Sequence, residues 1–125
     1  MTLEWKDSYR VGHADIDTQH YELFRLATLL FSCETHEMRL VHAKSLSDHT
    51  RDHFTHEESL MRSLHFPEID AHIAEHKLLL LRLDEIARDI AAGVLKGNDL
   101  EVFVSDWLVT HMTTSDAKLS SYVKS

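Results

Sequence analysis

Two segments decide the fold expected for this chain: HFTHEESLM at residues 53–61 and HIAEH at residues 72–76. Residues four apart on an α-helix lie about 40° apart around the axis and one turn apart along it. His53 and Glu57 therefore point toward one spot, and so do His72 and His76. Both pairs stand in apolar stripes, so both spots should face the interior, where an imidazole or a carboxylate needs a partner. Metal ions are common partners of both groups.

The composition is that of an ordinary globular protein of one domain. With 125 residues, 43% of them hydrophobic, the chain is long enough to bury a core of its own. A net charge of −8 argues against a nucleic-acid-binding protein and against docking on anionic lipid. The single cysteine, Cys33, excludes an intrachain disulfide and a thiolate zinc cluster. No membrane span or secretory signal is recognisable, so we expect a cytoplasmic protein.

Helical periodicity dominates the chain, because three glycines and one proline leave little room for β-turns and strict apolar alternation is absent. We expect an irregular N-terminal arm, residues 1–16, packed along four helices at about 17–34, 37–63, 67–92 and 99–116. Pro67 is expected as the first residue of the third helix, and Asn98 with Glu101 as a capping box opening the fourth. Short loops between amphipathic helices predict a single all-α domain, an up-down-up-down antiparallel four-helix bundle.

Every expected helix carries an inward-facing residue of the kind that binds metals. These are His20, the pair His53 and Glu57, the pair His72 and His76, and His111. A single inward histidine such as His20 is more often a hydrogen-bonded core residue, and His53 with Glu57 could form a buried pair without a metal. The coincidence across all four helices favours a metal site inside the bundle, where facing side chains build such sites.

Asp116 is harder to place by helical periodicity. Five residues of an ideal helix put it about 140° away from His111, whereas Ser115 shares the face of that histidine. Asp116 can join the site only if the helix ends, tightens or carries a π-type widening there. Such bulges are frequent at functional sites.

Together these motifs resemble the hemerythrin family, specifically bacterial hemerythrins and hemerythrin-like domains. The resemblance covers essentially the whole chain, with the signatures in the family's order and at its spacings. They are Trp5, Gly12-His-Ala-Asp-Ile-Asp17-Thr-Gln-His20, the HFxxEExxM pattern at 53–61, Phe66-Pro67, HxxxH at 72–76, WLxxH at 107–111, and Asp116. The five-residue spacing of His111 and Asp116 is the spacing of the family.

The resemblance implies a non-haem di-iron centre with a bridging oxo or hydroxo group. His72, His76 and His111 would bind one iron, and His20 and His53 the other. Glu57 and Asp116 would bridge the two ions, leaving one position open for reversible binding of O₂ on the second iron. The residues that match the family's oxygen pocket are Leu23, Phe54, Trp107, Leu108 and Met112, which are also plain core positions.

The resemblance therefore implies an oxygen store, carrier or sensor rather than an enzyme. The alternatives are an O₂- or redox-sensing input domain of a larger signalling protein, or a di-iron redox enzyme such as a peroxidase. A zinc or manganese bundle without oxygen chemistry also stays open, because affinity order alone does not select iron. Glu58 is expected to face solvent or to support the ligands rather than to bridge, and His13 is expected on the surface.

Overall fold

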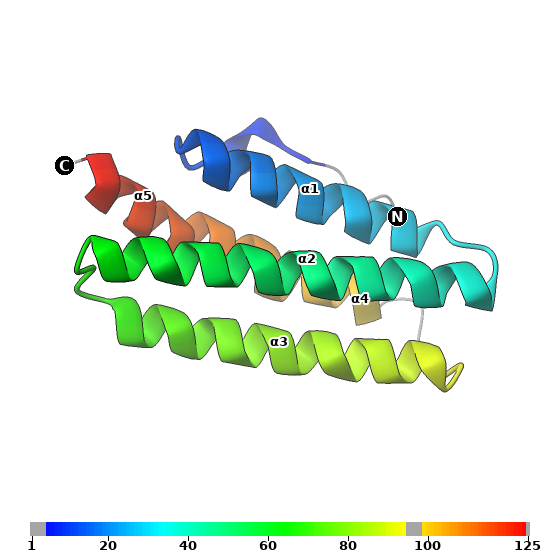
Figure 1. Ribbon diagram of the computed structural model, residues 1–125. Coiled ribbons are helices and arrows are strands. Elements are labelled where there is room, and N and C mark those ends of the chain that lie inside the picture. The colour runs from blue at the N-terminus through cyan, green and yellow to red at the C-terminus, as the bar shows by residue number, and fades with distance from the viewer. Residues whose placement is uncertain (1–4, 95–98, 125) are drawn as a thin grey trace.

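The computed structural model describes residues 5–94 and 99–124, which form a four-helix bundle (Figure 1). Three helices are regular: α1 spans Ala14–Phe31, α2 spans His36–Ser63 and α3 spans Ile69–Ala91. The fourth helix is composite. It consists of α4 (Asp99–Val102), the π-helical segments η2 (Phe103–Val109) and η3 (Met112–Asp116), and α5 (Ala117–Lys124). The described residues contain no strand.

Short connections determine how the helices lie. Residues 32–35 join α1 to α2 and residues 64–68 join α2 to α3, so each helix returns beside the one before it. Helix α2 packs against both α1 and α3, while η2 contacts α3 and the fourth helix runs behind α2 in the view of Figure 1. No helix among the described residues combines the length and the apolar character needed to cross a bilayer.

The first two helices begin at side-chain caps. Thr35 is the N-cap residue of α2, and its side chain accepts a hydrogen bond from the N–H of Met38 at 3.2 Å, as threonine commonly does at an N-cap. At α1, Nδ1 of His13 accepts from the N–H of Ile16 at 3.3 Å. His13 is thus half-buried and caps a helix, which corrects its expected place on the surface. Because of this cap, α1 begins at Ala14 rather than near residue 17.

The third helix begins at Ile69, so the expectation that Pro67 would be its first residue is wrong. His65 lies just beyond the end of α2, with its backbone in the left-handed region (φ 52°), and the buried Phe66 follows. The carbonyl of Phe66 then accepts a hydrogen bond from the N–H of Ile69 at 3.2 Å. This places Pro67 second in a four-residue turn, a position that its fixed φ also suits.

The fourth helix is longer than expected. It continues beyond residue 116 to Lys124, because Leu119 and Ser120 are buried and give the extension a packed face. The expected capping box starts at Asn98, which lies outside the described residues. The side chain of Glu101 is also outside them.

The N-terminal arm lies against α1. The ring of Trp5 makes edge contacts with Tyr21 and Phe24 at centroid distances of 5.7 and 5.4 Å. The carboxylate of Asp17 accepts hydrogen bonds from the N–H groups of Val11 at 2.8 Å and Gly12 at 3.1 Å. Gly12 has φ 87°, a conformation that side chains disfavour, so glycine suits the bend.

The apolar core is divided in two. A small cluster at one end of the bundle contains Ile16, Met61, Phe66 and Leu119. The large cluster fills the rest, with members from every helix such as Leu23, Phe54, Leu83 and Leu108. Ile16 precedes His20 by one turn and Met61 follows Glu57 by one turn, so a buried polar layer separates the two clusters.

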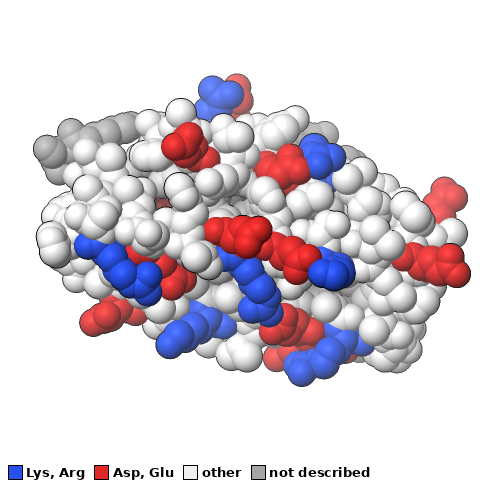
Figure 2. All heavy atoms as spheres, in the orientation of Figure 1, with Lys and Arg blue, Asp and Glu red and all other residues white. Residues whose placement is uncertain are grey.

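The surface in Figure 2 carries both signs of charge without a large patch of either. Basic and acidic side chains are interspersed, and some of them pair between helices. Arg51 of α2 lies 2.7 Å from Asp84 of α3, with both side chains almost half exposed. Exposed pairs of this kind contribute about 0–1 kcal/mol, so the bundle depends on its core.

Candidate metal centre

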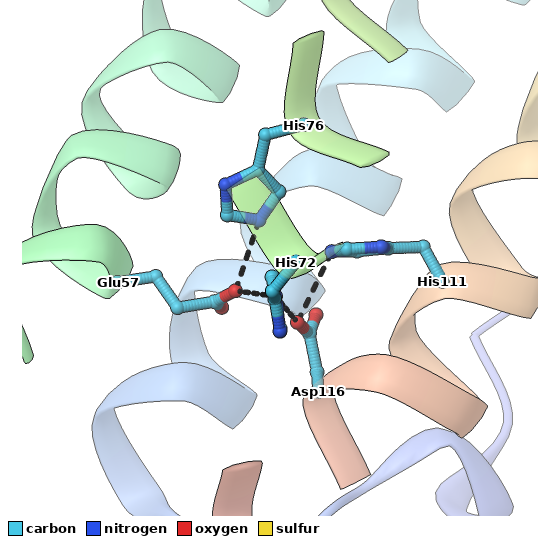
Figure 3. Close-up of side chains that lie close together, drawn as sticks. All are labelled: Glu57, His72, His76, His111 and Asp116. Atoms are coloured by element: carbon cyan, nitrogen blue, oxygen red, sulfur yellow. Dashed lines mark hydrogen bonds and ion pairs between the residues drawn. The ribbon is translucent and has the colours of Figure 1, made fainter. Parts of the chain in front are cut away.

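Five histidines and two carboxylates converge in the polar layer between the two apolar clusters. Each is at most 5% exposed, and together they come from all four helices. They are His20, His53, Glu57, His72, His76, His111 and Asp116. Figure 3 shows five of them, with the imidazoles of α3 and the fourth helix directed at Glu57 and Asp116. Every metal-ligand candidate from the sequence therefore lies in one place.

The seven residues form two overlapping groups. One contains His72, His76 and His111, the other contains His20 and His53, and both contain Glu57 and Asp116. Within each group the potential ligand atoms lie within 4.8 Å of one another. The two carboxylates thus stand between a three-histidine group and a two-histidine group.

Glu57 turns a different oxygen toward each group. Its Oε1 lies 2.6 Å from Nε2 of His72 and 3.1 Å from Nε2 of His76. Its Oε2 lies 3.2 Å from Nε2 of His53, on the other side. A carboxylate whose oxygens face two separate sets of imidazoles has the arrangement needed to bridge two cations.

Asp116 repeats this division. Its Oδ1 lies 2.9 Å from Nε2 of His72 and 3.2 Å from Nε2 of His111, and its Oδ2 lies 2.8 Å from Nε2 of His20. Both carboxylates thus have one oxygen toward the three-histidine group and one toward the two-histidine group.

The π-helical segment η3 brings Asp116 to this position. It spans Met112–Asp116, immediately after His111, and widens the helix so that residues five apart face the same side. The widening on which the participation of Asp116 depended is present. Ser115, which shares the face of His111 on an ideal helix, instead donates a hydrogen bond from Oγ to Glu75.

Several buried polar atoms of the cluster have no hydrogen-bond partner. Opposing nitrogens and oxygens approach one another closely but without hydrogen-bond geometry, which leaves their lone pairs available to a third centre. A buried polar atom without a partner costs about 1–3 kcal/mol, and cations bound between these atoms would remove that cost. Imidazoles and carboxylates suit iron, zinc and manganese. The atoms are Nε2 of His20, His53 and His111, Oε2 of Glu57, and Oδ1 and Oδ2 of Asp116.

Four side chains of the cluster favour their charged forms despite burial, as the directions of their pKa shifts show. Burial and the neighbouring negative charge of Asp116 oppose ionisation of Glu57, but its close contacts with the Nε2 atoms of His53, His72 and His76 outweigh them and lower its pKa to about 2. Burial likewise opposes ionisation of Asp116, yet His111 holds its pKa well below the ordinary value. Burial disfavours the charged form of His72, but Asp116 and Glu57 raise its pKa to about 9. The pKa of His111 is also raised, chiefly by Asp116 against burial.

The outer nitrogens of three of the five imidazoles contact side chains that sequence periodicity does not place in the site. Nδ1 of His76 lies 2.9 Å from Oε2 of Glu58, and Nδ1 of His111 lies 2.9 Å from Oε2 of Glu75. Nδ1 of His53 contacts the amide oxygen of Gln19. Because these oxygens only accept hydrogen bonds, the rings carry their hydrogen on Nδ1 and present Nε2 to the centre.

These three supporting residues differ in how far the sequence predicts them. Glu58 was expected either in solvent or behind the ligands, and it lies behind His76. Gln19 and Glu75 were missed, although each immediately precedes a ligand candidate in the chain, at His20 and His76. That adjacency is the only signal in the sequence that could have indicated them.

The expected wall of the site is apolar and buried where it is described. Leu23, Phe54, Leu108 and Met112 belong to the large core cluster. The ring of Phe54 stacks on His76 with a centroid distance of 3.8 Å and an interplanar angle of 6°. The side chain of Trp107 lies outside the described residues.

Known proteins with this pattern were found by sequence and by structure. Residues 11–123 match the family described as "Hemerythrin HHE cation binding domain". A bacteriohemerythrin of Pseudomonas paraeruginosa is 30% identical over 118 residues, which cover 92% of this chain and 77% of that protein. Myohemerythrin-1 of Phascolopsis gouldii is 29% identical over 114 residues, or 91% and 88% of the two chains. A crystal structure of a hemerythrin point mutant matches the entire fold with a TM-score of 0.87 at 23% identity.

Proposed function

Since this chain belongs to the hemerythrin family, we propose that it binds O₂ reversibly at a non-haem di-iron centre, and so stores, delivers or senses oxygen. One observation supports the proposal above the others. Glu57 and Asp116 each direct one oxygen to the three-histidine group and the other to the two-histidine group. Glu57 and Asp116, with the histidines on either side, would hold two cations, and a di-iron pair with an oxo or hydroxo bridge would suit this arrangement.

The two positions differ in the number of ligands that the protein supplies. His72, His76 and His111 with two carboxylate oxygens give five donors to one iron, whereas His20 and His53 with the other two oxygens give four. The position at His20 and His53 thus has room for an external ligand. Two ferrous ions held by these residues would supply the two electrons that reversible uptake of O₂ requires.

The surroundings of the site favour binding and release over turnover. Leu23, Phe54, Leu108 and Met112 are each at most 3% exposed and offer no acid or base to a bound ligand. An apolar wall of this kind would keep water and protons away from a ligand held in the site. The imidazoles of His53, His76 and His111 are themselves held by hydrogen bonds from Nδ1 to neighbouring side chains.

The test is optical. The apoprotein is loaded anaerobically with two ferrous ions per chain, exposed to air, and then purged with argon while the visible spectrum is recorded. We expect a ligand-to-iron charge-transfer band that appears in air, at one O₂ per two irons, and disappears under argon. The same protein loaded with zinc is the matched control and should show no band.

Two outcomes would overturn the proposal. If air converts the centre at once to a stable ferric spectrum that argon does not reverse, the protein is a redox sensor or an enzyme rather than an oxygen carrier. If anaerobic loading leaves less than two irons per chain and no visible band forms, the seven residues do not assemble a di-iron centre.

A further inference from the structure

The two histidine groups differ in what stands behind their imidazoles. Behind the three-histidine group are two carboxylates, Glu58 against His76 and Glu75 against His111, each with an oxygen 2.9 Å from Nδ1. Behind the two-histidine group, the neutral amide of Gln19 contacts Nδ1 of His53. Nδ1 of His20 is buried and has no hydrogen-bond partner among the described residues. Thus both outer carboxylates serve the same metal position.

We propose that Glu58 and Glu75 are positioning residues that make the three-histidine position the tighter of the two metal positions. The proposal rests on the di-metal centre proposed above and adds an order of affinity within it. A carboxylate that accepts the Nδ1–H bond draws that hydrogen outward and raises the electron density at Nε2. A neutral amide fixes the ring in the same way but adds no charge.

The placement of the two carboxylates supports a role in the site. The side chain of Glu58 is 21% exposed and partly shielded from water, whereas that of Glu75 is 48% exposed and is held by its contacts with His111 and Ser115. Glu58 has only a distant cation, with Arg62 at 3.8 Å, and no lysine or arginine among the described residues pairs with Glu75. Their negative charge therefore remains available to the imidazoles and to a cation behind them.

Ser115 adds a second contact that fixes Glu75. Its Oγ donates to the same Oε2 atom that accepts from His111. Because Ser115 belongs to η3, the widened turn that directs Asp116 inward also directs a donor toward Glu75. The carboxylate is consequently held between the third and fourth helices rather than free to rotate into solvent.

The experiment measures zinc affinity without oxygen or redox chemistry. The apoprotein is titrated with Zn²⁺ against a chromophoric chelator, which should resolve two binding steps of unequal affinity. His20→Ala removes a donor of the two-histidine group and should leave the tighter step in place, which assigns that step to the three-histidine group. Chemical denaturation of each apo variant separates loss of folding from loss of metal affinity.

Glu58→Gln and Glu75→Gln keep an acceptor oxygen but remove the charge. We expect each to weaken the tighter step, and the double variant to weaken it about 10–100-fold, the range typical of such outer partners, with little effect on the weaker step. Glu85→Gln is the matched control. Glu85 is an exposed residue of α3, the helix that carries Glu75, and it pairs with Arg82 instead of a histidine. This substitution should change neither step.

The reciprocal variant is Gln19→Glu, which gives His53 the kind of partner that His76 and His111 have. It should tighten the weaker step and narrow the gap between the two, an effect that loss of structure cannot produce. The proposal is overturned if the charge-removing variants leave the tighter step unchanged or weaken both steps equally. Since no O₂ is present, a failure of reversible oxygen binding would leave this result intact.

Discussion

Raising the pH from 7 to 9 should tighten metal binding by about 50-fold, because His72 must release a proton that the apoprotein holds firmly. Burial favours neutral His72, but Asp116 and Glu57 prevail and raise its pKa from 6.5 to about 9. The proton and the metal compete for the same Nε2 atom. Affinity therefore rises with pH up to the pKa and levels off above it.

The magnitude follows from the distance between the pKa and the working pH. At pH 7, two units below a pKa of about 9, each unit reduces the apparent affinity tenfold, or about 1.4 kcal/mol. Removing the proton therefore costs about 2.7 kcal/mol at neutral pH. The pKa of His111 is raised as well, so the slope should be steeper than that of a single proton over part of the range.

The assay is zinc competition with a chelator of known pH dependence, repeated between pH 6.5 and 9. Calorimetry in buffers of different ionisation enthalpy would count the protons released, and at least one per bound metal pair is expected at pH 7. His56→Gln, at an exposed histidine of the same helix as Glu57, should leave that count unchanged. Equal affinity at pH 7 and 9, with no proton released, would refute the reasoning.

Three further predictions concern stability. The apoprotein should resist urea best between about pH 4.5 and 6.5. The stability contributed by ionised Glu57 is lost as the pH falls toward its pKa of about 2, and the stability contributed by protonated His72 is lost as the pH rises toward its pKa of about 9. A stability that does not change with pH would contradict this. Phe54→Ala should lower the free energy of unfolding by about 3–5 kcal/mol, measured by urea denaturation, because the ring is 2% exposed and leaves a cavity. Asp17→Ala should lower the free energy of unfolding by about 1–3 kcal/mol and speed hydrogen exchange of the Val11 and Gly12 amides, which donate hydrogen bonds to Asp17. Unchanged exchange at these amides would show that other contacts hold the arm.

The bundle and most of its site could be predicted from periodicity. Pairs four residues apart, such as His53 with Glu57, have one geometric meaning on an α-helix, and their apolar neighbours indicate which side is inward. Convergence then requires only that antiparallel helices meet at one height. The family resemblance, confirmed by the comparison over residues 11–123, extended this reasoning to Asp116.

Local backbone exceptions could not be predicted in this way. An α-helical repeat excludes Asp116 from the face of His111, and only the packed fourth helix shows the wider turn. The cap at His13 was missed because capping rules favour small hydroxyl and carboxamide side chains over imidazole. The start of α3 shifted because Phe66 is buried first and places Pro67 in a turn.

Contacts between helices were the other source of error. Gln19 and Glu75 lie beside the inward stripe of their own helices, and each reaches a histidine of another helix. The periodicity of one helix does not show how far the side chains at the edge of its inward stripe lie from the neighbouring helix. Such residues become predictable only when the distance and rotation between helices are known.

The widened turn at Met112–Asp116 also sets the angular phase of every residue after it. Downstream, Leu119 lies in the small core cluster, and Oγ of Ser120 donates to the carbonyl of Val11 at 2.7 Å. Removing one residue from the turn would rotate all of α5 by about 100° and turn both side chains away from the arm. The backbone geometry that brings Asp116 to the histidine cluster is therefore the same geometry that fixes the last helix to the arm.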